Sequence, residues 1–293
     1  LSIKIVYSWD ANATTKLQYS LEKQTHLNAT IIKYIFAIKV PLALFFIFTL
    51  DKISNVISGA MCAAGVVDAT DYGAYLLVLK ILNLYLFGYW IVLNSKDVKL
   101  ENQPYIKQKF SLFIALFFLL VIEIVLEFMM FDAIDIESVV DCCGVIYSSS
   151  SISYLSVVLN LDAQILLTIF YAVFAIILLA YFLKNSYIFA LANLLFLIIS
   201  LITLISFFGT YIYELPTHKC PFCFLQRDYN YIGYLLYILL FLGTFNGLVL
   251  EFINFSKEES RRVYKISLFF NTLYLLIVSY FPIIYYMKNG VWL

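Results

Sequence analysis

Two cysteines separated by two residues are the strongest chemical signal in this sequence. Cys220 and Cys223 lie in the segment His-Lys-Cys-Pro-Phe-Cys, so His218 and Lys219 come directly before them. Two thiols at this spacing can close a small disulfide ring or hold one soft metal ion. Nearby cations favour the thiolate form of cysteine, which is the reactive form. The segment therefore predicts a thiol–disulfide site, with a static disulfide or a zinc clip as the alternative.

The other three cysteines lie upstream, as the adjacent pair Cys142 and Cys143 and as the lone Cys62. A disulfide between neighbouring residues is strained and easily reduced, so an adjacent pair is typical of redox or metal sites. An equally weighted alternative is that each of the two pairs with a distant cysteine. A lone loop cysteine such as Cys62 is more often a disulfide partner than a catalyst. Five cysteines cannot all pair within one chain, and a thiol relay predicts such a spare thiol.

The composition is that of a membrane protein. The chain is 63% hydrophobic and 13% charged, whereas a soluble domain is about half apolar and about a quarter charged. The apolar residues gather in runs of about 20 residues, the length of a helix that crosses a hydrocarbon core of about 30 Å. The formal net charge is +0, so no electrostatic argument supports a nucleic-acid partner.

The apolar runs predict seven membrane-spanning segments. Backbone amides cannot remain unpaired in lipid, so each segment is expected to be a helix and the fold class to be an all-α polytopic membrane protein. The short connection between the fourth and fifth segments predicts a tight helical hairpin. The expected spans are residues 34–50, 72–93, 110–131, 164–183, 187–211, 231–255 and 263–286.

The distribution of lysine and arginine gives the expected orientation. Loops on one side hold 13 of the 19 basic residues, loops on the other side hold 4, and 2 lie within spans. Basic loops stay in the cytoplasm, so the N-terminus is expected to be cytoplasmic and the C-terminus outside. The loops at residues 51–71, 132–163 and 212–230 are then on the outer side, and each contains cysteine.

Four regions follow from this topology. They are a cytoplasmic N-terminal tail (1–33), three transmembrane helices with the outer Cys62 loop (34–131), an outer loop with Cys142 and Cys143 (132–163), and four transmembrane helices with the outer Cys-Pro-Phe-Cys loop (164–293). An outward location is oxidising in a bacterium or in an endomembrane system, where disulfides persist. Of the two, we expect an integral protein of the bacterial inner (plasma) membrane with its cysteine loops outside. All five thiols are then expected to react with a membrane-impermeant maleimide.

The segment Cys220-Pro-Phe-Cys-Phe-Leu-Gln-Arg227 resembles the DsbB family of membrane disulfide-generating proteins. In that family an outward Cys-x-x-Cys precedes a transmembrane helix and is followed by Glu or Gln and then Arg. The resemblance implies that Cys223 faces a quinone and that Arg227 lies near the quinone oxygen. Gln226 and Tyr231 complete the expected quinone site.

The same resemblance implies a soluble, thioredoxin-like thiol partner on the outer side, from which electrons pass to the quinone. The family carries a second cysteine pair downstream of its Cys-x-x-Cys, whereas no cysteine follows Cys223 here. The shuttle role must therefore fall on upstream cysteines, and Cys142 with Cys143 is the expected pair, with Cys62 as the alternative. If a helix has already begun at Cys223, Arg227 lies one turn further along the same face.

The expected function is that of a thiol:quinone oxidoreductase, with quinone as cofactor, no metal, and membrane lipid around the helices. Two alternatives come from other classes of protein. Cysteines beside Met61 and His218 are suitable ligands for Cu(I) or Zn, so the chain could bind or move a soft metal. It could also be a structural subunit of a membrane complex.

Ionisable residues within the spans predict one intramembrane ion pair. Lys80 and Glu123 lie at similar depths in the second and third spans, with Glu127 one turn further out. Such groups are costly in lipid and are usually paired. The pair is expected to be structural, or to form a proton route for quinone protonation. Lys39 is expected to extend to the inner surface, and residues 243–247 form a G-x-x-x-G pattern that indicates helix packing.

Overall fold

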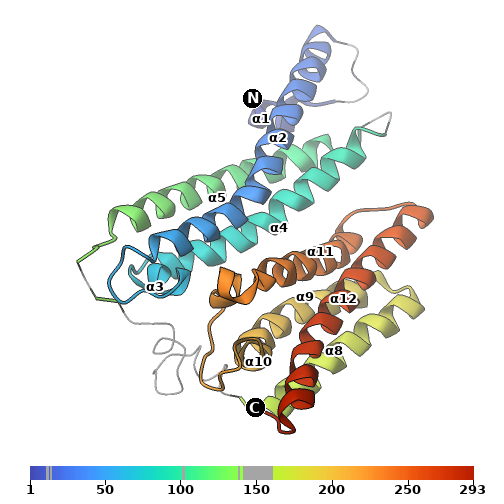
Figure 1. Ribbon diagram of the computed structural model, residues 1–293. Helices are drawn as coiled ribbons and strands as arrows, with labels where there is room; N and C mark the ends of the chain where they lie inside the picture. The colour runs from blue at the N-terminus through green and yellow to red at the C-terminus, as the bar shows by residue number, and fades with distance from the viewer. Residues whose placement is uncertain (11–12, 14, 101–102, 138, 141–160) are drawn as a thin grey trace. The chain divides into compact units, whose positions relative to one another are not determined.

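All regular structure in the described part of the chain is helical. The computed structural model describes residues 1–10, 13, 15–100, 103–137, 139–140 and 161–293 (Figure 1). The helices are α1 (Ser2–Ser8), α2 (Lys16–Ile53), α3 (Ala63–Asp68), α4 (Gly73–Asp97), α5 (Ile106–Asp132), α8 (Ala163–Leu183), α9 (Ser186–Thr203), α10 (Gly209–Tyr213), α11 (Ile232–Phe252) and α12 (Lys257–Asn289). The described residues contain no strand, which confirms the predicted all-α fold class.

Among the described residues, seven helices are long and apolar enough to cross a membrane, as predicted. They are α2, α4, α5, α8, the continuous helix Ser186–Tyr213, α11 and α12. The chain is therefore an integral, multi-pass membrane protein. The first of these helices begins at Lys16, so residues 16–33 of the expected tail are helical, and Pro41 lies inside the helix.

The described residues divide into two compact units, and each is described by itself. The first unit comprises Leu1–Thr49 and Ala69–Ile134, and the second comprises Leu50–Asp68 and Asp135–Leu293. The Cys62 loop thus groups with the last four membrane-spanning helices, whereas the sequence placed it with the first three.

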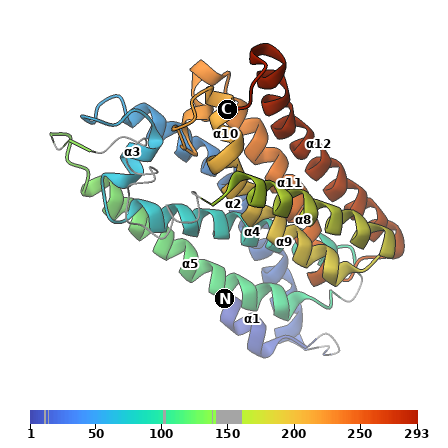
Figure 2. The same cartoon turned by 90° about the horizontal axis from the view of Figure 1, so that it is seen from below.

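The first unit packs α1, α2, α4 and α5 around an aromatic core, and α4 and α5 lie side by side in both views (Figure 2). The Phe36 ring of α2 stacks on Phe87 of α4 with centroids 4.3 Å apart. It also meets the edge of Trp90 at 5.4 Å. The indole of Trp90 donates a hydrogen bond of 2.8 Å to the Lys109 carbonyl, which joins α4 to α5.

A fully buried ion pair closes the same end of α4 and α5. The Lys109 ammonium lies 2.7 Å from the Asp97 carboxylate, and the two side chains are 1% and 0% exposed. Lys109 also donates to Asn94, and Asp97 accepts from the Tyr105 amide. The sequence counted Lys109 with the basic loop before the third expected span. In the structure α5 begins at Ile106, so Lys109 is part of this helix and its side chain is buried.

The second unit packs α8, α9, α11 and α12, and two glycines allow a close approach in its centre. A Cβ atom at Gly243 would overlap Asn271 of α12, and one at Gly247 would overlap Asn193 of α9. The freed space holds polar contacts, since Asn271 donates to Asn193 over 2.8 Å and Ser267 donates to the Gly243 carbonyl over 2.7 Å. These contacts confirm the predicted packing role of the G-x-x-x-G pattern.

Candidate functional site

Three cysteines from distant parts of the second unit meet in one cluster. The Sγ atoms of Cys62, Cys220 and Cys223 all lie within 4.8 Å of one another. The Cys62 and Cys220 sulfurs are 3.5 Å apart, well beyond the length of a disulfide bond, about 2.05 Å. The three residues are 0%, 0% and 6% exposed, respectively. We call this group the three-thiol cluster.

Two tyrosines hold the Cys-Pro-Phe-Cys loop in place. The Tyr213 hydroxyl donates to the Cys220 carbonyl over 2.6 Å and accepts from the Phe224 amide over 3.1 Å. The Tyr237 hydroxyl donates to the Pro221 carbonyl over 2.7 Å. The Cys220 and Pro221 carbonyls and the Phe224 amide thus have hydrogen-bond partners within the protein, which buried backbone groups require because water cannot reach them.

A π-helical turn precedes Tyr213. Residues Leu204–Phe208 form this turn between α9 and α10. A π turn inserts into an α-helix and is frequent at functional sites. It rotates the residues that follow it around the helix axis, and Tyr213 lies on that last α-helical turn.

Gln226 ties the Cys62 segment to the Cys-Pro-Phe-Cys loop. Its amide nitrogen donates to Asp51 Oδ1 over 2.8 Å and to the Met61 carbonyl over 3.0 Å. Met61 directly precedes Cys62, so these bonds help to fix Cys62 beside Cys220. At Cys220 itself, the Phe222 amide donates to the sulfur over 3.4 Å. A backbone donor in this position favours negative charge on the sulfur.

The backbone around Gly59 brings a further segment next to the Cys62 loop. The Val140 amide donates to the Ser58 carbonyl over 3.0 Å. Gly59 has a φ of +88°, and a Cβ atom there would overlap the Val140 carbonyl. Only glycine fits such a position without strain. Cys142 and Cys143 follow Val140 in the sequence, but both lie outside the described residues.

Arg227 does not share a helical face with Cys223, because no helix runs from Cys223 to Arg227. Cys223–Leu225 and Arg227–Tyr229 are two short 3-10 turns, and the extended Gln226 separates them. Helix α11 begins only at Ile232, which also leaves Cys223 away from a helix N-terminus. The Arg227 side chain is exposed.

The other two expected cations are half-buried. The His218 ring meets the edge of Tyr213 with centroids 4.6 Å apart. Burial lowers the pKa of the Lys219 ammonium below its usual value. Lys219 therefore gives up its proton more readily than a solvated lysine.

Burial also corrects the expected accessibility of the thiols. An impermeant maleimide cannot reach a sulfur in a residue that is 0% to 6% exposed, which is the case for all three members of the cluster. Labelling of these three cysteines therefore reports on local opening or unfolding, and not on topology alone.

Sequence reasoning missed Tyr213, Tyr237 and Asp51 as parts of this site. Tyrosine is common at membrane surfaces, so neither tyrosine stood out among the 24 in the chain. Asp51 lies 175 residues before Gln226, and no local spacing connects them. The Gln-Arg signal after the second cysteine did identify Gln226, although its observed role is to bind the Cys62 segment.

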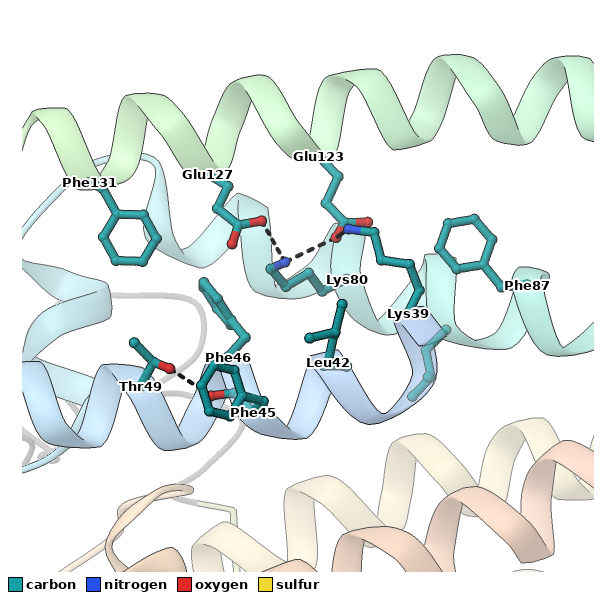
Figure 3. Close-up of a pocket in the computed structure, with 12 residues that line it drawn as sticks. Lys39, Leu42, Phe45, Phe46, Thr49, Lys80, Phe87, Glu123, Glu127 and Phe131 are labelled. Atoms are coloured by element: carbon teal, nitrogen blue, oxygen red, sulfur yellow. Dashed lines mark hydrogen bonds and ion pairs between the residues drawn. The ribbon is translucent and has the colours of Figure 1, made fainter. Parts of the chain in front are cut away.

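A second polar site lies within the spans of the first unit (Figure 3). Lys80 of α4 is 3.0 Å from Glu123 and 2.9 Å from Glu127, both of α5. Lys39 of α2 is also 3.0 Å from Glu123. The Lys80 ammonium lies 4.2 Å from the centre of the Phe46 ring, a cation–π distance. The four ionisable groups border a cavity of about 320 Å³.

These contacts confirm the predicted pair of Lys80 and Glu123. The expectation for Lys39 is wrong, because its ammonium binds Glu123 and does not extend to the inner surface. The Glu123 carboxylate also accepts a 2.6 Å hydrogen bond from Asn83, so it has three donors. A carboxylate held by three donors favours the structural interpretation of this network, and the proton route stays a prediction.

The fold and the site define an integral membrane protein that has, in its described part, seven helices able to span a membrane and a buried cluster of three thiols. In comparisons with known proteins, no family model, no curated protein and no solved structure matches this chain. The resemblance to the DsbB family therefore stays a prediction from the residues between Cys220 and Arg227.

Proposed function

We propose that this protein is a membrane thiol–disulfide oxidoreductase. In its three-thiol cluster, a disulfide between Cys220 and Cys223 exchanges with one between Cys62 and Cys220. The observation that carries the proposal is the position of Cys62, 3.5 Å from Cys220 and next to a Cys-x-x-Cys pair. Disulfides exchange when a third sulfur attacks one sulfur of an existing bond. The cluster supplies both the pair and the attacking sulfur.

The exchange balances within the cluster. The Cys62 thiolate attacks Sγ of Cys220 in the oxidised Cys220–Cys223 pair. A bond forms between Cys62 and Cys220, the bond between Cys220 and Cys223 breaks, and Cys223 leaves as a thiolate that takes up the proton lost by Cys62. The cluster contains one disulfide before and after the step, so it neither gains nor loses electrons. The step transfers the disulfide to Cys62.

Burial explains why a relay is needed. A soluble protein cannot reach Cys220, which is 0% exposed. Cys142 and Cys143 follow the segment that pairs with the backbone beside the Cys62 loop. We assign them the outer role in the relay: one attacks Cys62 and then exchanges with a thioredoxin-like thiol partner on the predicted outer side.

The electron acceptor in this proposal is a quinone. Two electrons and two protons leave the Cys220 and Cys223 thiols when their disulfide forms, and a bound quinone is an acceptor that takes up both. Of the residues expected to hold it, Gln226 is engaged by Asp51 and Met61. The Arg227 side chain is exposed and Tyr231 is 44% exposed, so these two are available to a quinone ring.

A second candidate function is the binding of a soft metal ion, and the cluster geometry supports it. Zinc–thiolate bonds of about 2.3 Å place two ligands on one tetrahedral ion about 3.8 Å apart. Three sulfurs within 4.8 Å of one another fit this requirement. The sequence predicted no metal, and that expectation stays a prediction.

Replacing Cys223 tests the relay. In Cys223→Ser the normal partner of Cys220 is absent, so oxidation is expected to produce a disulfide between Cys62 and Cys220, because these sulfurs are already in contact. Mass spectrometry of peptides from unreduced protein detects this bond. Cys62→Ser is the control, which should retain the Cys220–Cys223 disulfide. Oxidised Cys223→Ser without any Cys62 disulfide would contradict the proposed exchange.

A further inference from the structure

A second large cavity lies in the second unit, at the end opposite the cysteine loop. Its volume is about 950 Å³. The connections between α8 and α9 and between α11 and α12 both border it. The charge distribution predicts that this end of the unit faces the cytoplasm.

The cavity is strongly basic. Four cationic side chains line it, against the single carboxylate of Glu251; the cations are Lys184, Lys257, Arg261 and Lys265. None of the four is in an ion pair within the described part of the chain. Four like charges gathered without partners repel one another, which an anionic ligand would relieve.

A buried hydroxyl in the cavity wall is the second observation. Tyr264 lines the cavity and is only 8% exposed, and its hydroxyl has no hydrogen-bond partner among the described residues. A buried hydroxyl without a hydrogen-bond partner is costly, and most buried polar atoms in proteins do have such a partner. An acceptor oxygen of a ligand would satisfy it.

We propose that this cavity binds the phosphate of an anionic phospholipid. The phosphate oxygens match both the lysine and arginine donors and the Tyr264 hydroxyl. Basic pockets between transmembrane helices on the cytoplasmic side suit lipid headgroups. The acyl chains have an apolar surface next to the cavity, since Phe182 lines it and is 74% exposed, and Leu183 beside it is 72% exposed.

Lipid retention by the purified full chain tests this proposal. Native mass spectrometry would compare phosphatidylglycerol with phosphatidylcholine, added in equal amounts to delipidated protein in neutral detergent. Phosphatidylglycerol should be retained in excess. Arg261→Ala should weaken that retention roughly fivefold, as expected for about 1 kcal/mol per cation near a lipid headgroup. Tyr264→Phe should weaken it as well, because it removes the donor and keeps the ring.

Arg262→Ala is the matched control. Arg262 is adjacent, has the same charge and is exposed like Arg261, but it does not line the cavity. It should leave retention unchanged. Equal retention of the two lipids by the wild type, or equal effects of Arg261→Ala and Arg262→Ala, would overturn the proposal. Excess inorganic phosphate distinguishes a lipid phosphate from a free phosphate ion as the ligand. Full displacement of the lipid by inorganic phosphate would mean that the site binds the free ion.

Discussion

Asp97→Ala is expected to destabilise the first unit by about 3–5 kcal/mol, the usual cost of removing one partner from a buried ion pair. The substitution leaves the Lys109 ammonium, which is 1% exposed, without its carboxylate. It also removes the acceptor of the Tyr105 amide at the start of α5. Thermal unfolding of the purified protein in detergent, followed by tryptophan fluorescence, measures the loss.

Two further variants test whether the loss of stability comes from the unpaired buried charge or from any substitution in this region. Asp132→Ala removes an exposed aspartate from the end of α5, so it should change stability little. The double variant Asp97→Leu with Lys109→Met removes both charges and should recover most of the loss, because apolar residues often replace a buried pair without cost. If the single and double variants were equally unstable, the unpaired charge would not be the cause.

The second large effect is expected from the cysteines. Cys62→Ser and Cys220→Ser should both lose oxidation of an external dithiol, but only Cys62→Ser should still form the Cys220–Cys223 disulfide. Cys220 belongs to both proposed disulfides, so Cys220→Ser should abolish oxidation of an external dithiol peptide. Cys62→Ser should retain a reversible Cys220–Cys223 disulfide and still fail to oxidise that peptide, because Cys220 is buried and the relay is cut.

This pattern also distinguishes the two candidate functions. A metal ion held by three thiolates loses one ligand in either variant, so both substitutions should weaken metal binding alike. Identical redox behaviour of Cys62→Ser and Cys220→Ser would therefore count against the relay and favour the metal site. Oxidation of the peptide is followed by its loss of free thiols, and the state of the protein by alkylation before denaturation.

The membrane architecture could be predicted because hydropathy is a local signal. Each span consists of about 20 consecutive apolar residues. In lipid the backbone of such a segment must form its own hydrogen bonds, so the segment is a helix. Helix ends were less well predicted. Residues 16–33 are too polar to count as a span, yet they continue α2, because Leu21, Ala29 and Ile32 bury one helical face against the first unit's core.

The candidate site was predictable only in part, because its assembly is tertiary. The spacing of Cys220 and Cys223 is visible in the sequence, but the contact of Cys220 with Cys62 spans 158 residues. Helix α11 begins only at Ile232, after the Cys-Pro-Phe-Cys loop. Loop hydrogen bonds from Tyr213, Tyr237 and Gln226 hold this segment instead. Likewise, residue depth predicted the Lys80–Glu123 pair, whereas Lys39 joins it from α2.

The most direct test of the three-thiol cluster is a redox titration of the wild-type protein, combined with metal analysis of the same sample. The protein would be equilibrated with thiol buffers of increasing oxidising power, alkylated under denaturing conditions, and mapped by mass spectrometry. The proposed relay predicts a reversible two-electron transition and two alternative disulfides, Cys220–Cys223 and Cys62–Cys220, in protein that contains no stoichiometric metal. Three thiols that stay reduced throughout the titration while retaining one equivalent of zinc or copper would contradict the relay.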